Sequence, residues 1–146
     1  MRIPTILASV AALLAPIAAA QAQTVSRAAA SGVPLKLIFA NSSNPDCSSV
    51  GQTTIRVVAA PQHGRTRVTA ARDFPTFREN NVRSVCNTRR VAGATAHYVS
   101  QRRYVGWDST SIEVIYPSGR LLRVTYNISV RSGYANLLTS RCPARA

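Results

Sequence analysis

Residues 111–130 read SIEVIYPSGRLLRVTYNISV and carry the strongest structural signal of the chain. Apolar and polar residues alternate through the second half, and one face of it holds Leu122, Val124, Tyr126, Ile128 and Val130. A period of two is typical of a β-strand with one buried face. Pro117, Ser118 and Gly119 separate this run from a shorter one and are turn-forming residues. We therefore predict a β-hairpin with arms at 111–116 and 121–130.

Outside this hairpin, four more runs predict strands, at 34–40, 53–60, 65–71 and 91–100. The turn-forming segment 61–64 lies between two of them, so we predict a second hairpin whose polar face carries Arg65 and Arg67. Segment 104–108 is expected to form a turn, and no helix-period stretch occurs beyond residue 22. Several short strands separated by turn signals predict an all-β fold, an antiparallel sandwich.

The N-terminal residues 1–22 have the pattern of a secretory signal peptide. Arg2 precedes a mostly apolar run, and Ala20-Gln21-Ala22 is a small-residue cleavage pattern. An uncleaved membrane helix is the alternative, but Pro4 and Pro16 interrupt the run. We therefore expect a secreted or periplasmic protein without a transmembrane anchor after cleavage. The rest divides into a flexible leader at 23–33, the sandwich at 34–132 and a C-terminal tail at 133–146.

Secretion determines how the three cysteines are interpreted. In an oxidising compartment they predict one disulfide and one remaining thiol. Cys47 and Cys86 each stand in a polar loop beside the central strands, whereas Cys142 lies near the C-terminus, so we favour the pair Cys47–Cys86. Cys142 would then be free or form an intermolecular bond, which leaves the oligomeric state open. The cysteine and histidine spacing fits no zinc pattern, and we expect no metal.

The charge is strongly unbalanced, with 18 basic and 5 acidic residues and a net charge of +13. This balance excludes a cationic partner. All basic residues except Lys36 are arginines, which fits either bidentate contacts with phosphate, sulfate or carboxylate or the codon bias of a GC-rich genome. The candidate polyanion-binding residues are Arg65, Arg67, Arg89, Arg90, Arg102 and Arg103.

Few residues are of catalytic type. The chain contains five carboxylates and two histidines, and it has no nucleophile-elbow, zinc-protease or phosphate-loop motif. We therefore predict no enzymatic activity and no cofactor. Asp108 is expected to cap the turn that follows it, and His63 to be a turn residue. Trp107 is either a partly exposed aromatic platform or, the reading we favour, a plug at the end of the sandwich.

Several of these residues together resemble a known family. PQHGRTRV at 61–68, Tyr98, YVGWD at 104–108 and a closing hairpin through Gly119 are similar to the signature of bacterial Ig-like, cadherin-like (VCBS-type) modules. The resemblance covers roughly residues 53–130. Segment CNTRRV at 86–91 also resembles small secreted bacterial proteins built from one such domain. The resemblance implies an Ig-like β-sandwich of about seven short strands and a place at the cell surface. Calcium is not expected, because Asp46 and Asp108 are isolated.

Two functions follow as hypotheses. The first is a non-enzymatic interaction or structural module of the cell envelope, with an envelope protein as partner. The second is an arginine-rich binder of polyanions such as acidic polysaccharide, lipopolysaccharide or extracellular DNA. The two differ in whether the candidate arginines gather on one face, which depends on the fold.

Overall fold

The computed structural model describes residues 22–133, so most of the predicted signal peptide and of the C-terminal tail, with Cys142, lies outside the described residues. The described part contains seven strands and one short 3-10 helix, η1, and no α-helix. None of it forms a helix with the length and apolar character that crossing a membrane requires. The elements are β1 Ala22–Ala30, β2 Leu35–Ala40, β3 Thr54–Ala59, β4 Gly64–Asp73, η1 Ser84–Thr88, β5 Val91–Ser100, β6 Gly106–Ile115 and β7 Leu121–Arg131. The predicted all-β class is confirmed.

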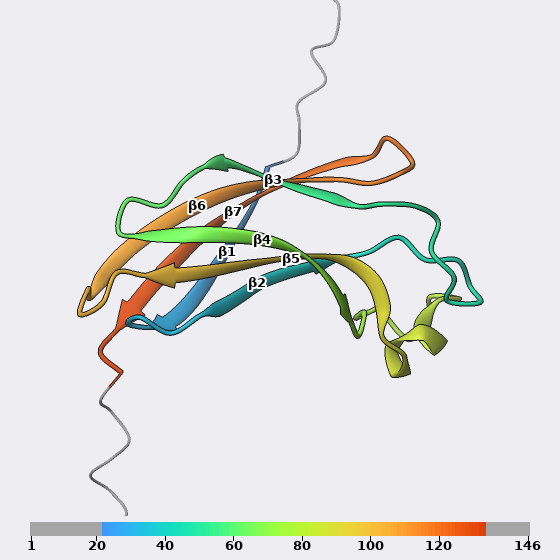
Figure 1. Cartoon of the computed structure of the whole chain (residues 1–146), viewed down its shortest axis with the longest axis horizontal. Coiled ribbons are helices and arrows are strands. Elements are labelled where there is room, and N and C mark those ends of the chain that lie inside the picture. The colour runs from blue at the N-terminus through green and yellow to red at the C-terminus, as the bar shows by residue number, and fades with distance from the viewer. Residues whose placement is uncertain (1–21, 134–146) are drawn as a thin grey trace, which may run out of the picture.

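The strands form two sheets that face each other as layers (Figure 1). One sheet has the order β1-β7-β6-β3 and the other the order β2-β5-β4. All neighbouring strands are antiparallel except β1 and β7, which pair in parallel. The sandwich is therefore mixed, which corrects the prediction of a purely antiparallel one.

The core lies where the inner faces of the two sheets meet. From β7 it contains Val124, Tyr126, Ile128 and Val130, as the alternation in this strand predicts. Opposite them lie Leu37, Ala40, Ala94, Ala96 and Tyr98. The core combines the small alanines of β5 with the larger side chains of Tyr98 and Tyr126, and such a mixture of sizes allows a close-packed interior.

Strand β1 corrects the prediction for the N-terminal side, where residues 23–33 were expected to form a flexible leader. The strand runs along β7 with Val25 opposite Tyr126 and Ala29 opposite Val130. Ala29 is buried and Val25 half-buried, so only a thin apolar face contacts the core. An edge strand held mainly by backbone hydrogen bonds needs little side-chain patterning, which explains why the Ala/Ser-rich composition concealed it.

The prediction that residues 53–60 and 65–71 form a hairpin is also wrong. Strand β3 pairs with β6 and β4 pairs with β5, so the connection at 60–63 crosses from one sheet to the other. Turn-forming residues predict a reversal of direction, but they do not say which strand the chain joins next. Both strands are sheet edges, and Val57, Val58 and Val68 are accordingly exposed.

Strand β6 begins at Gly106, five residues before the predicted start of the hairpin arm. The predicted turn at 104–108 therefore overlaps a strand, and the actual connection between β5 and β6 spans 101–105. The first part of β6 lacks apolar alternation because its inward positions are Asp108 and Thr110, which are buried although polar. Gly106 has φ +148°, a conformation that favours glycine, and the Tyr104 hydroxyl would lie 2.9 Å from a Cβ there.

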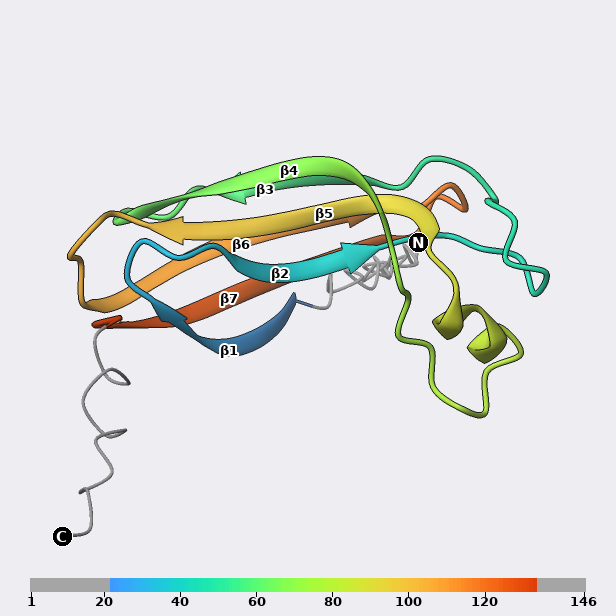
Figure 2. The same ribbon diagram turned by 60° about the horizontal axis from the view of Figure 1, so that its bottom comes forward.

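The sandwich has two unlike ends (Figure 2). At the turn end, short connections at 31–34, 60–63 and 101–105 join the strands. At the loop end, the long segments 41–53 and 74–90 are joined by a disulfide between Cys47 and Cys86, whose Cα atoms are 5.5 Å apart. This confirms the predicted pair.

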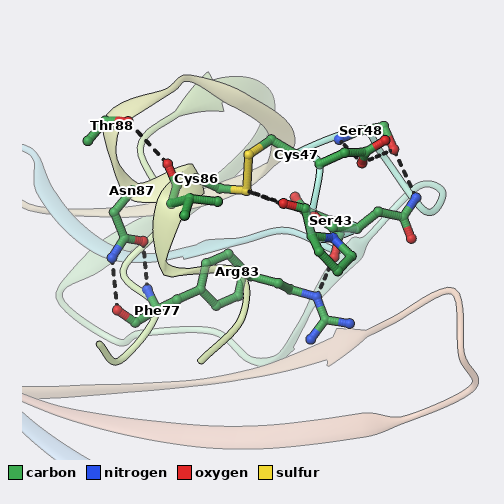
Figure 3. Close-up of a disulfide and its surroundings, with 12 residues drawn as sticks. Ser43, Cys47, Ser48, Phe77, Arg83, Cys86, Asn87 and Thr88 are labelled. Atoms are coloured by element: carbon green, nitrogen blue, oxygen red, sulfur yellow. Dashed lines mark hydrogen bonds between the residues drawn. A yellow bond between two sulfur atoms is a disulfide. The ribbon is translucent and has the colours of Figure 1, made fainter. Parts of the chain in front are cut away.

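Hydrogen bonds order the loops around that disulfide (Figure 3). The Arg83 Nε donates to the Ser43 carbonyl oxygen over 2.6 Å. The Asn87 side chain accepts from the Phe77 backbone N–H and donates to the Phe77 carbonyl oxygen, at 2.9 and 2.8 Å. Cys86 is fully buried. The loop end is thus a cross-linked structural unit.

Candidate binding site

Trp107 lies on the outer face of the four-stranded sheet, at the turn end, with 71% of its surface exposed. The prediction of a plug is therefore wrong, and the alternative of an exposed aromatic side chain is the one observed. The cause is the strand alternation of β6, which turns Asp108 and Thr110 toward the interior and Trp107 and Ser109 toward solvent.

A buried carboxylate anchors the strand directly beside Trp107. Asp108, only 7% exposed, accepts hydrogen bonds from the backbone N–H groups of Gln62 (3.0 Å), His63 (3.1 Å) and Ser109 (2.9 Å), and from the Tyr98 hydroxyl (2.8 Å). Asp108 was expected to cap the turn after it. It caps instead the connection between β3 and β4, which lies 45 residues earlier in the chain.

The Tyr98 hydroxyl works in this cluster as a permanent donor. Burial raises the pKa of Tyr98 above its ordinary value, and the hydrogen bond to Asp108 raises it further. Tyr98 lies on β5 in one sheet and Asp108 on β6 in the other. Their hydrogen bond therefore links the two layers, and with the bonds to the 60–63 connection it fixes three segments together.

Tyr104 supports Trp107 from the other side. Its hydroxyl donates to the Trp107 carbonyl oxygen over 2.6 Å, and its ring stacks on the His63 ring with centroids 4.2 Å apart and an interplanar angle of 12°. His63 lies in the connection between strands, in agreement with the turn predicted there. The backbone of Trp107 is thus held by its neighbours in sequence and by the adjacent turn.

A cavity of about 480 Å³ opens beside the indole. It is lined by Ser26, Gln62, Trp107, Asp108, Ser109 and Asn127. The strand register explains the grouping, because Ser26 of β1, Asn127 of β7 and Ser109 of β6 lie opposite one another in one row across the sheet. The next row consists of Ala28, Ser129 and Trp107, so only small side chains lie next to the indole in its own row.

The six candidate arginines do not form one cluster. Arg89 and Arg90 precede β5, and Arg102 and Arg103 follow it. Because β5 has ten residues, at about 3.3 Å per residue the two pairs are on the order of 30 Å apart, at opposite ends of the sandwich.

Part of the set does meet at the turn end. Arg65 lies opposite Val99, near the end of β5, and Arg65 and Arg102 line one cavity of about 370 Å³. Arg102 and Arg103 line a neighbouring cavity of about 530 Å³. Arg67 lies two residues further along β4, on the outer face of the three-stranded sheet. We call Arg65, Arg67, Arg102 and Arg103 the basic group.

Few of the charges are neutralised inside the protein. Within residues 22–133 the ion pairs are Lys36 with Asp73, and Arg123 with Glu113 at 3.0 Å. The same part of the chain holds no group of three or more histidine, cysteine, aspartate or glutamate side chains arranged to bind a metal. The arginines of the basic group are therefore without an ion-pair partner among the described residues.

Sequence reasoning did not find Ser26, Gln62, Ser109 and Asn127. Ser26 was hidden because β1 was not recognised as a strand. Asn127 was correctly placed on the polar face of β7, but its neighbours across the sheet depend on the register. The sequence did offer one signal, because Trp107 and Asp108 are adjacent on a strand and adjacent residues point to opposite faces. If Asp108 is buried, Trp107 must therefore lie on the outer face.

The fold and the site thus define a two-layer β-sandwich with a polar, aromatic surface at one end. Comparisons of the chain with protein-family models, with curated proteins and with solved structures find no match.

Proposed function

We propose that the protein is a non-enzymatic interaction module of the cell envelope, secreted or periplasmic, that binds its partner through the face around Trp107. The observation that carries this proposal is the exposure of Trp107 on a strand whose backbone is anchored on both sides. Exposing an indole to water is unfavourable, and exposed aromatic side chains with polar surroundings are typical of interaction surfaces.

The strand order supports an Ig-like topology for this module. In an Ig sandwich the second, fifth and fourth strands form one sheet, and the third, sixth and seventh form the other. The sheets β2-β5-β4 and β7-β6-β3 have this order. Strand β1 lies beside β7 instead of β2, which is the difference from the constant-type arrangement.

The proposed location is supported by two features of different kinds. One is the signal-peptide pattern at residues 1–22. The other is the disulfide between Cys47 and Cys86, since disulfides persist in oxidising compartments outside the cytosol.

The test is co-sedimentation of the purified protein with isolated cell envelopes. The variants are Trp107→Ala and, as a matched control, Leu121→Ala. Leu121 is 51% exposed on the same outer face. It lies on β7, eight residues before Ser129, the residue that pairs with Trp107. We expect the Trp107→Ala variant to lose most of the bound fraction and Leu121→Ala to keep it. The proposal would be contradicted if the original protein and both variants sedimented to the same extent, or if the original protein did not sediment with the envelopes.

A second candidate function is polyanion binding, favoured by the meeting of Arg65, Arg102 and Arg103 at the turn end. Arginines gathered at one place bind phosphate or sulfate groups by bidentate hydrogen bonds and release counterions. The test compares Arg102→Ser/Arg103→Ser with Arg89→Ser/Arg90→Ser on a heparin matrix in a salt gradient. Both variants lose two charges. Earlier elution of the first alone supports a site, whereas equal shifts would show a response to net charge only.

A further inference from the structure

We propose that the face around Trp107 is a saccharide-binding site that takes a neutral, β-1,4-linked pyranose chain, with Ser26, Gln62, Ser109 and Asn127 as its hydrogen-bonding residues. This inference rests on the proposed function and names the class of partner.

The first argument is the chemistry of the exposed indole. A pyranose ring in which most hydroxyls are equatorial has two apolar C–H faces and a polar rim, so it needs an aromatic surface below and hydrogen-bonding groups around. Trp107 offers the surface: it is 71% exposed and its row neighbours Ala28 and Ser129 are small. Aromatic side chains such as the indole combine a large apolar contact area with a preferred contact geometry.

The second argument is the unused hydrogen-bonding capacity around the indole. None of the side chains of Ser26, Gln62, Ser109 and Asn127 makes a hydrogen bond to another described residue. Further along the same face two pairs of polar side chains bond to each other: Ser111 with Thr125 at 2.9 Å, and Arg123 with Glu113. Around the indole, by contrast, the amides and hydroxyls of the cavity lining remain available to donate and accept.

The third argument is charge. The cavity lining holds no lysine or arginine, although the protein has a net charge of +13. Its single carboxylate, Asp108, already accepts four hydrogen bonds. Arg131 stands one row beyond Ser129, outside the lining. A lining of amides, hydroxyls and one indole matches a neutral, hydroxyl-rich ligand, while the basic group lies on other elements.

The fourth argument is shape and rigidity. The rows of three strands make a surface about 10 Å wide, and a β-1,4-linked chain is extended and flat enough to lie on it. The Asp108 cluster and the Tyr104 hydroxyl hold the start of β6 and the 60–63 connection, while strand pairing places Asn127 on β7 and Ser26 on β1. A site that is formed before binding spends less of the contact energy on ordering its own residues.

Trp107 is the only tryptophan of the chain, so its fluorescence reports on this site alone. The experiment titrates the full chain with chitohexaose and, separately, with cellohexaose. It records the emission maximum of Trp107 and its quenching by acrylamide, a neutral quencher that the positive charge does not attract. A stacked sugar ring is expected to shift the emission to shorter wavelength and to reduce quenching, with a dissociation constant on the order of 1 mM because one open surface buries little of the ligand.

The variant that tests the hydrogen-bonding residues is Ser109→Ala/Asn127→Ala. Both positions are exposed on the outer face, so the fold is expected to remain, which circular dichroism checks. We expect its affinity for the responding saccharide to fall about fivefold to tenfold, as for the loss of one or two hydrogen bonds. The Leu121→Ala variant should bind like the original protein.

The inference would be overturned if neither saccharide changed the fluorescence of Trp107 at about 10 mM. Equal fluorescence responses of the protein and the Ser109→Ala/Asn127→Ala variant would also overturn it. A third titration uses polygalacturonate, a polyanion, and a response to it alone would also overturn the inference, in favour of polyanion binding. If both saccharides fail while envelope sedimentation still depends on Trp107, the saccharide inference fails and the proposed envelope function stands. Loss of envelope sedimentation itself would remove the proposed function.

Discussion

Asp108 shows at the scale of one residue how a polar side chain can organise a β-sandwich. Its carboxylate collects four donors from three segments, which compensates for the cost of burying a charge. We expect Asp108→Asn to lower the free energy of unfolding by roughly 3 kcal/mol and Tyr98→Phe by about 2 kcal/mol, because hydrogen bonds to a charged group are lost in the interior. Urea-induced unfolding measures both. As a control, Asp46→Asn changes an exposed aspartate bonded only to Ser48, and a similar loss there would contradict the assignment.

The raised pKa of Tyr98 predicts how stability depends on pH. The folded protein keeps the phenolic proton to a higher pH than the unfolded chain does. This stabilisation is therefore complete below about pH 10, the ordinary value for tyrosine, and is lost as the pH rises above it. Burial also raises the pKa of Tyr126, which acts in the same direction. We expect urea unfolding midpoints to fall above pH 10, and to fall less steeply in Tyr98→Phe. An identical pH dependence in both proteins would rule out Tyr98 as a source.

At the scale of one element, the packing of β1 against the core can be tested at two neighbouring alanines. Ala29 faces the core and is 7% exposed, while Ala28 faces solvent on the same strand. We expect Ala29→Glu to lower the free energy of unfolding by roughly 3 kcal/mol, because it places an unpaired charge in the core. Ala28→Glu should change it by less than about 0.5 kcal/mol. Equal values from chemical denaturation would mean that residues 22–30 do not pack as a strand in solution.

The elements also differ in how well the sequence predicts them. Strand β7 was placed correctly because four buried apolar residues alternate with polar ones. Strand β1 was missed because it has only a thin apolar face, and the start of β6 was missed because Asp108 and Thr110 occupy its inward positions. A period-two pattern detects hydrophobic contact with the core, so it cannot detect strands whose stability comes from backbone pairing or buried hydrogen bonds.

Prediction of the candidate site required the strand register, which the sequence does not provide. The exposure of Trp107 was available as an alternative interpretation, and the choice between surface and core required the register of β6. The row of Ser26, Asn127 and Ser109 joins residues about 100 positions apart in the chain. The distribution of the arginines was equally undetermined, because β5 separates Arg89 and Arg90 from Arg102 and Arg103 by the length of the sandwich.

At the scale of the whole molecule, the two ends of the sandwich have separate tasks. The loop end is cross-linked, with Cys47 and Cys86 joining segments that are 39 residues apart. The turn end carries Trp107, the Asp108 cluster and the basic group. The strands between them place the disulfide about 30 Å from the indole, so the stabilisation that the disulfide supplies can be changed without altering the face around Trp107.

This separation leads to a prediction for the reduced protein. Breaking the Cys47–Cys86 bond frees a loop of 39 residues that contains β3 and β4, and the lost constraint on the unfolded chain corresponds to about 4 kcal/mol. We expect Cys47→Ser/Cys86→Ser, prepared together with Cys142→Ser so that no other thiol reacts, to unfold at a lower urea concentration than the Cys142→Ser protein. Before unfolding, the emission maximum and the acrylamide quenching of Trp107 should be the same in both proteins, because the Asp108 cluster that anchors the turn end does not include the disulfide. A change of Trp107 fluorescence in the folded variant would show that the two ends are coupled through the sheets.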